Sequence, residues 1–127
     1  SYKYTLQGVA EDEMKKACDK DAATTCFVEG DKLVIDLGGE RTITSFHYLP
    51  DQSEYNKGLI SSYEIAVGTD ANAINTVVKQ GEFSNIKHNP ILQSVYFTPI
   101  NARYISLKPT KMVNEGEQMG FAEIAIR

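Results

Sequence analysis

Residues Leu33–Pro50, with the sequence LVIDLGGERTITSFHYLP, decide the fold class of this 127-residue chain. The first five of them alternate in polarity up to a pair of glycines, and residues 42–49 are rich in β-branched and aromatic side chains up to a proline. Alternation with a period of two, bounded by glycine or proline, is typical of short, half-buried strands. The stretch therefore predicts two strands, over residues 33–37 and 42–49.

The same pattern continues toward the C-terminus. Tyr63, Ile65 and Val67 fall on one face of a predicted strand, and Ile124 and Ile126 fall on the inner face of the last one. Further strands are expected at residues 60–67, 74–78, 93–97, 102–108 and 122–126. About seven strands at short spacing predict a β-sandwich or a barrel.

Residues 10–20 differ from this pattern. Their acidic side chains come first and their basic ones follow, an order that the helix dipole favours. We therefore expect at most a short helix or a turn in this segment.

Composition and charge limit the number of domains and the class of partner. With 42% hydrophobic residues, the chain is long enough to build one core, and residues 1–127 are expected to form a single domain. Its 13 Lys and Arg against 17 Asp and Glu, without a basic block, give no field that attracts phosphates. Nucleic acid and anionic lipid are therefore not expected as partners. The apolar runs are far shorter than the roughly 20 residues of a spanning helix, so no membrane insertion is expected.

The sequence motifs of common enzymes are absent. There is no GxSxG, HExxH, GxGxxG or Walker phosphate loop. His47 lies within a predicted strand and is expected to pack there rather than to catalyse. The 17 acids supply many pairs, so composition does not exclude glycosidase chemistry, but a small sandwich offers little cleft to raise the pKa of a general acid. The chain is therefore expected not to be an enzyme.

The two cysteines do not form a redox or zinc motif. Cys18 and Cys26 are too far apart for a CxxC pair, and only His47 and His88 could complete a tetrahedral zinc site with them. A small local disulfide and two buried thiols both remain open.

A short acidic segment between these cysteines has the residue types of a cation loop. Asp19, Asp21 and Thr24 follow one another at spacings of two and three, so a tight loop can turn several oxygens toward one point. Calcium prefers carboxylate, hydroxyl and carbonyl oxygens. A turn in which the same side chains cap local backbone groups is the alternative.

This segment opens a series of motifs that occur in a characteristic order. It reads Ala17-x-Asp19-x-Asp21-x-x-Thr24-x-Cys26, which resembles the A-x-D-G-D-x-x-T-x-W motif of discoidin-type (factor V and VIII type C) domains. That family includes family 32 carbohydrate-binding modules. Further matches follow at residues 33–38, 43–50, 58–65, 81–83, 95–97, 102–107 and 122–124, so the resemblance covers about residues 10–127. Within it, Gly81–Pro90 most resembles the C-terminal accessory domains of bacterial α-L-fucosidases.

The resemblance implies an all-β, galactose-binding-domain-like jelly-roll sandwich with about eight antiparallel strands. It also implies a structural calcium ion near one end, which ties the N-terminal loop to the last strand. The residues that match the family's ligand positions are Lys16, Asp19, Asp21, Thr24, Ala122 and Glu123. Lys20 stands where the family usually has glycine.

The resemblance further implies a sugar site on the loops at one end of the sandwich. Some of its contact residues differ from those of galactose-binding members of the family. Phe27 and Asp51 stand where galactose-binding members have a histidine and an arginine, whereas Asn56 matches the family. Recognition of galactose in the usual way is therefore not expected. The candidate sugar contacts are Phe27, Gln52, Tyr55, Asn56, Lys57, His88 and Gln118. Tyr55 and Asn56 can supply a stacking platform beside an amide, or they can belong to an ordinary polar loop.

The function that the resemblance implies is that of a non-catalytic carbohydrate-binding module. Such a module would belong to a larger bacterial glycoside hydrolase of α-L-fucosidase type, secreted or periplasmic. Its partners would be glycan and the catalytic domain of the parent enzyme. The alternative is a structural or docking appendage that has lost sugar binding, which the missing histidine and arginine favour.

Overall fold

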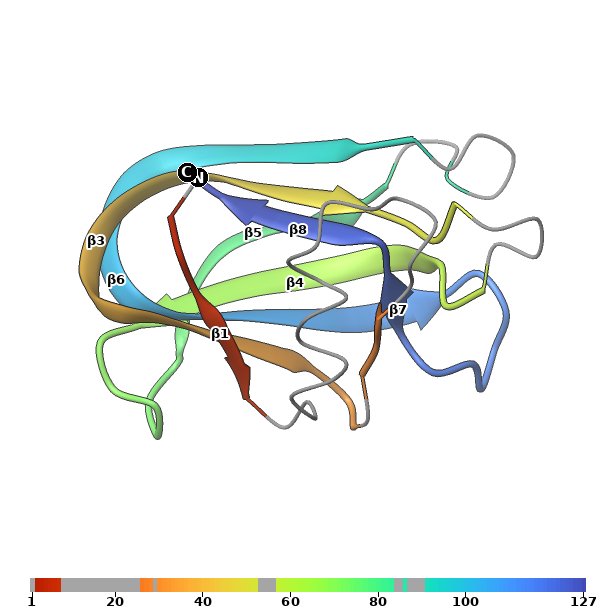
Figure 1. Cartoon of the computed structure of the whole chain (residues 1–127), viewed down its shortest axis with the longest axis horizontal. Coiled ribbons are helices and arrows are strands. Elements are labelled where there is room, and N and C mark those ends of the chain that lie inside the picture. Colours follow the sequence, from red (N-terminus) through yellow and green to blue (C-terminus); the bar gives the residue numbers. More distant parts are fainter. Residues whose placement is uncertain (1, 8–25, 29, 53–56, 84–85, 87–90) are drawn as a thin grey trace.

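The computed structural model of the chain describes residues 2–7, 26–28, 30–52, 57–83, 86 and 91–127, with only the backbone of residue 26. All regular structure in these residues is β-strand (Figure 1). The strands are β1 (Thr5–Gln7), β2 (Cys26–Phe27), β3 (Leu33–Leu49), β4 (Ile60–Gly68), β5 (Thr76–Glu82), β6 (Gln93–Met112), β7 (Gly120–Phe121) and β8 (Glu123–Ile126). The described part of the chain therefore holds no helix that could cross a membrane. The short helix or turn expected at residues 10–20 lies outside the described residues.

The strands form an antiparallel jelly-roll sandwich. The main sheet has the order β1-β3-β6-β4-β5, with β8 paired to β3 as well, and β2 pairs with β7 in a small second sheet. Figure 1 shows the long strands β3 and β6 curving round together at one end, so that each contributes to both layers. The expected all-β jelly roll is confirmed.

Two predicted strand ends are wrong because the long strands bend instead of stopping. β3 runs through the glycine pair: Gly38 adopts a φ of 77°, and its N–H donates to Asp36 Oδ1 at 2.8 Å. Pairing with β6 is lost after Asp36 and resumes at Arg41, opposite Ala102. β6 likewise joins the two strands expected at residues 93–97 and 102–108. Because both strands bend together, the ladder continues beyond residues that would end an isolated strand.

The strand expected at residues 74–78 is displaced toward the C-terminus. Asp70 accepts hydrogen bonds from the N–H of Asn72 and from that of Ala73, which holds a turn before the strand. β5 therefore begins at Thr76 and stays paired with β4 as far as Glu82.

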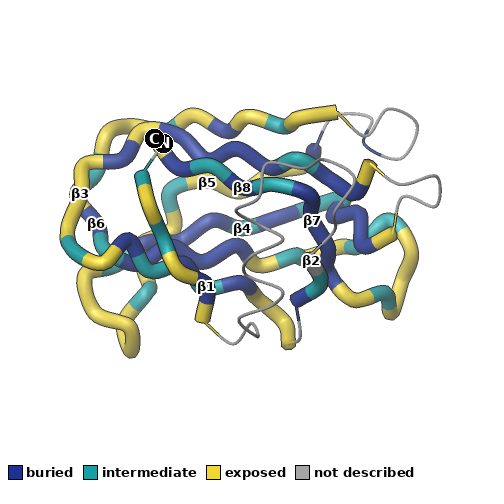
Figure 2. Tube along the Cα trace, viewed as in Figure 1, coloured by how far each residue is buried: buried dark blue, intermediate teal, exposed yellow. Residues whose placement is uncertain are grey.

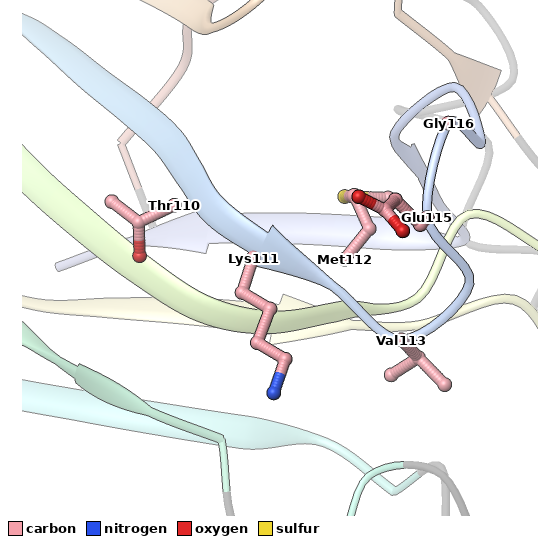
Figure 3. Close-up of a pocket in the computed structure, with 6 residues that line it drawn as sticks. All are labelled: Thr110, Lys111, Met112, Val113, Glu115 and Gly116. Atoms are coloured by element: carbon pink, nitrogen blue, oxygen red, sulfur yellow. The ribbon is translucent and has the colours of Figure 1, made fainter.

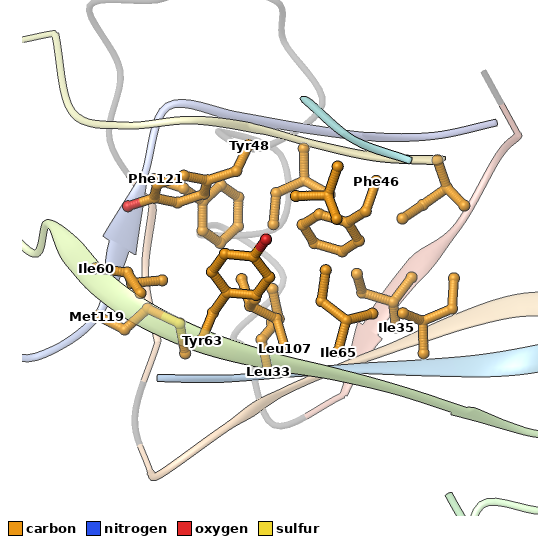
Figure 4. Packing of buried hydrophobic residues seen from close by; sticks show 14 of the residues in the cluster. Leu33, Ile35, Phe46, Tyr48, Ile60, Tyr63, Ile65, Leu107, Met119 and Phe121 are labelled. Atoms are coloured by element: carbon orange, nitrogen blue, oxygen red, sulfur yellow. The ribbon is translucent and has the colours of Figure 1, made fainter. Parts of the chain in front are cut away.

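The core lies between the two layers (Figures 2 and 4). Tyr63, Ile65 and Val67 are all buried on one face of β4, as the alternation predicts, and Ile124 and Ile126 are buried on β8. Aromatic rings fill the space near one end. Phe83 stacks between Tyr48 and Tyr63, with ring centroids 5.0 and 4.4 Å apart.

The two ends of the chain lie side by side near the bend of β3 and β6 (Figure 1). The N–H of Tyr2 donates to the carbonyl of Ile126 at 2.9 Å, and the carbonyl of Arg127 accepts from Thr44 and Ser45 of β3. The loops that connect β3 to β4 and β6 to β7 lie at the opposite end of the sandwich.

Candidate functional site

The connections after β3 and after β6 meet at two glycines. The N–H of Gly120 donates to the carbonyl of Gly58 at 3.1 Å. Gly58 has a φ of 72°, and a Cβ atom at this position would lie 2.4 Å from the Gly120 nitrogen. Glycine at position 58 therefore serves both the left-handed conformation and the close approach of the two loops. We call the described residues of segments 50–59 and 117–120, together with Phe27, the loop cluster.

A buried tyrosine of β3 contacts both loops where they meet at the two glycines. The Tyr48 hydroxyl donates to the carbonyl of Gly120 at 2.8 Å and lies 3.4 Å from that of Gly58. Burial raises the pKa of Tyr48 far above its usual value, so the hydroxyl keeps its proton and remains a donor. The side chain thus connects the β-sandwich core to both loops.

Two carboxylates fix the first loop of the cluster through its backbone. Asp51 is only 2% exposed, and its Oδ2 accepts the N–H of Lys57 at 2.8 Å. The Oε1 of Glu117 accepts the N–H of Gly58 at 2.7 Å, across to the second loop. Asp51 therefore braces the loop from inside instead of facing a ligand.

The structure brings four of the seven candidate sugar contacts to the loop cluster. Phe27 is half-buried and pairs with Gly120 in the small sheet. Lys57 and Gln118 are exposed on the two loops that the glycines join. Gln52 is also exposed, and its side-chain amide donates to the carbonyl of Pro50 at 2.9 Å. The other three candidates, Tyr55, Asn56 and His88, lie outside the described residues.

Sequence reasoning missed the residues that hold the loop cluster together. The loops are held by Tyr48, Glu117 and the Gly58–Gly120 contact. None of these was predicted from the sequence to be functional. One signal was available for Tyr48, because a tyrosine on the inner face of a strand requires a hydrogen-bond acceptor. No comparable local signal marks Glu117, since its acceptor role depends on a loop distant in sequence.

The last candidate metal ligands lie where the small sheet meets β8. Ala122 is buried, and its N–H donates to the carbonyl of Leu49 at 2.8 Å. Glu123 is half-buried, and no hydrogen bond or ion pair joins its carboxylate to another described residue. The other candidates, Lys16, Asp19, Asp21 and Thr24, fall outside the described residues. In the described part of the chain, no group of three or more His, Cys, Asp or Glu side chains could hold a metal.

His47 packs within β3, as expected, and lies outside the loop cluster. Its two ring nitrogens lie 2.8 Å from the hydroxyls of Ser45 and Ser94, and its ring meets Tyr96 edge-on. Burial, and then the charge of Arg127, lower the pKa of His47. The neutral imidazole can therefore donate to one serine and accept from the other.

Among solved structures, family 32 carbohydrate-binding modules have a fold similar to that of this chain. A module of CpGH89 from Clostridium perfringens, in complex with GalNAc-β-1,3-galactose, is 23% identical, with a TM-score of 0.78 over 98% of this chain and 93% of that one. The module of C. perfringens NanJ, in complex with galactose, is 23% identical, with a TM-score of 0.74 over 98% and 91%. These similarities establish the fold that this chain shares with them.

A third solved structure is closer in sequence and much longer. It is a glycoside hydrolase 29 family member from an unknown rumen bacterium, 32% identical, with a TM-score of 0.71 over 81% of this chain and 18% of that one. No curated protein sequence matches. The sequence profile of the F5/8 type C domain matches residues 11–125.

Proposed function

The chain belongs to the F5/8 type C domain family, and on that basis we propose that it is a non-catalytic carbohydrate-binding accessory module. One observation carries the proposal. The Gly58–Gly120 contact joins two loops and the small sheet, so that Phe27, Lys57 and Gln118 lie at one end of the sandwich. Sugar sites combine an apolar surface with a few fixed polar groups, and these three side chains supply both.

The roles of the acids favour binding over catalysis. Asp51 and Glu117 are the carboxylates that brace the loop cluster, and each accepts a backbone N–H. Glycoside hydrolysis needs a pair of carboxyl groups that flank the scissile bond, whereas these two carboxylates hold the backbone of the loop.

The parent protein in this proposal is a secreted or periplasmic bacterial glycoside hydrolase of α-L-fucosidase type. The 32% identical match to part of a glycoside hydrolase 29 family member supports a hydrolase. The resemblance of Gly81–Pro90 to accessory domains of α-L-fucosidases supports the type. A tethered module of this kind raises the effective concentration of glycan near the catalytic domain.

We also propose a structural calcium ion at the junction of β2, β7 and β8. Cys26 at the start of β2 pairs with Phe121, the neighbour of Ala122, and the segment that carries Asp19, Asp21 and Thr24 precedes β2 in the sequence. The half-buried Glu123 carboxylate has no partner among the described residues, and it offers the hard oxygen that calcium prefers. With the Ala122 carbonyl it would complete a ligand set whose other members are Lys16, Asp19, Asp21 and Thr24. Calcium bound there would fasten the N-terminal loop to the last strand.

The alternative is a docking appendage without a sugar site. Phe27 and Asp51 replace the histidine and arginine of galactose-binding relatives, and Asp51 is turned inward. These substitutions favour the alternative if no other glycan is recognised.

A glycan array with the isolated chain tests the two functions. We expect binding to a galactosylated, fucosylated or N-acetylhexosamine glycan at millimolar concentration. Glycan binding should be weakened by each of the variants Phe27→Ala, Tyr55→Ala, Asn56→Ala and Gln118→Ala. It should not be weakened by Lys79→Ala on β5. Thermal melting of each variant separates loss of contact from loss of fold. Absence of binding across these glycans would leave the docking appendage as the function.

A further inference from the structure

A hollow of about 440 Å3 lies where β6 ends and the chain turns toward β7 (Figure 3). It is lined by Thr110, Lys111, Met112, Val113, Glu115 and Gly116. Ligand pockets typically measure about 300–1,000 Å3, and the volume of this hollow lies within that range.

The polar groups of the hollow favour a neutral, hydroxyl-rich ligand. Lys111 offers three N–H donors, Glu115 offers carboxylate acceptors, and the Thr110 hydroxyl can do both. Neither charged group forms an ion pair within the described part of the chain, and Figure 3 shows their head groups well apart. Because the two charges are opposite, the lining attracts neither phosphates nor cations as a class.

The chain segment that lines the hollow contains a β-bulge and is held by backbone hydrogen bonds. Lys111 lies opposite Ser62 in the β4–β6 ladder and Pro109 lies opposite Tyr63, so Thr110 has no opposite residue. A bulged residue is left out of the ladder, and its backbone groups are open to other partners.

Two hydrogen bonds hold the segment that follows the bulge. The N–H of Val113 donates to the carbonyl of Leu59 at 3.0 Å, and the N–H of Glu117 donates to that of Asn114 at 3.2 Å. Met112 and Val113 are half-buried and give the wall an apolar surface. A sugar ring presents hydroxyl groups at its edge and C–H groups on its face, which this combination of groups fits.

The hollow is continuous along the chain with the loop cluster. Glu117 and Gln118 follow its last lining residue, and Leu59, which fixes Val113, follows Gly58. We propose that the hollow is a second sugar subsite, which takes a neutral pyranose unit adjacent to the one held at the loop cluster. This inference rests on the proposed function, and it makes the chain selective for oligosaccharides over monosaccharides.

Titration of the 15N-labelled chain with galactose and with GalNAc-β-1,3-galactose, followed by NMR, tests the second subsite. Amides of Phe27, Lys57 and Gln118 should shift with both sugars, and those of Lys111 and Glu115 only with the disaccharide. The double variant Lys111→Ala, Glu115→Gln should lower disaccharide affinity about tenfold, to that of galactose, as expected for lost hydrogen bonds to charged groups. Lys108→Ala, an exposed change on the same strand, should leave both affinities unchanged.

The outcomes separate this inference from the proposed function. Shifts at the loop cluster without shifts at Lys111 and Glu115 overturn the second subsite alone. An unchanged disaccharide affinity in the folded double variant does the same. If neither sugar shifts any amide of the loop cluster, the proposed function fails for these sugars, and the second subsite fails with it.

Discussion

Gly58 and Gly120 form a backbone contact so close that no side chain fits between them. A Cβ on Gly58 would lie 2.4 Å from the nitrogen of Gly120, and that nitrogen donates a hydrogen bond to the Gly58 carbonyl. The contact joins the loop after β3 to the loop after β6. The placement of the candidate sugar contacts therefore depends on two residues that have no side chain.

Gly58→Ala should destabilise the chain more than Gly116→Ala does. Both glycines have a positive φ, so each substitution costs about 1–2 kcal/mol through backbone conformation. Only Gly58 adds a clash, since nothing lies within 4 Å of a Cβ at Gly116. Urea unfolding of the two variants measures the difference. Equal free energies of unfolding would show that the loops can separate at no cost.

Tyr48→Phe should lower the free energy of unfolding by about 1–3 kcal/mol, because the buried Gly120 carbonyl loses its hydroxyl donor. Tyr63→Phe is the matched control. The Tyr63 hydroxyl makes no hydrogen bond with a described residue, so its removal should change stability by no more than about 0.5 kcal/mol. Chemical denaturation followed by tyrosine fluorescence gives both values, and a Tyr48→Phe variant as stable as the control would contradict the bracing role.

Stability should fall as the pH is lowered from about 7 toward 5, in part through His47. Burial holds its pKa in the folded chain below the ordinary value of about 6.5, so the unfolded state takes up the proton first. The stabilising contribution is therefore present above that value and is lost as the pH falls toward the folded pKa. His47→Gln should flatten the pH dependence of unfolding. An NMR titration that gives His47 an unshifted pKa would refute this account.

Removal of calcium by a chelator should lower the melting temperature. A ligand at 100 times its dissociation constant stabilises the folded state by about 2.7 kcal/mol. Glu123→Gln and Asp19→Ala should each remove most of the sensitivity to chelator, whereas Glu115→Gln should keep it. A melting curve that does not respond to chelator would refute the calcium site.

The sequence predicts the faces of the strands better than their ends. Ile65 and Val67 are buried as their alternation requires, because one face of each strand packs on the core. Gly38 was expected to end a strand, since glycine commonly does so in isolation. It lies instead in a bend that β3 shares with β6, and a bend of that kind depends on the partner strand.

In the candidate site, too, features set by the local sequence could be predicted, whereas contacts between residues that the fold brings together could not. The motif order places Phe27, Lys57 and Gln118 on loops, whereas the structure puts Phe27 in strand β2 and brings all three to one end of the sandwich. The sequence also marks Asp51 as an unusual residue for a sugar site. Its bond to the Lys57 N–H could not be predicted, because that bond depends on how the loop closes in three dimensions.

The hydrogen bond between Tyr2 and Ile126 bears on how the molecule could be mounted on a surface. It holds both chain ends together near the bend, at the end of the sandwich away from the loop cluster. A tag or linker attached at either end would leave from the same place and would turn the loop cluster toward the solution. Immobilisation through one end or the other should therefore present the same face to a glycan.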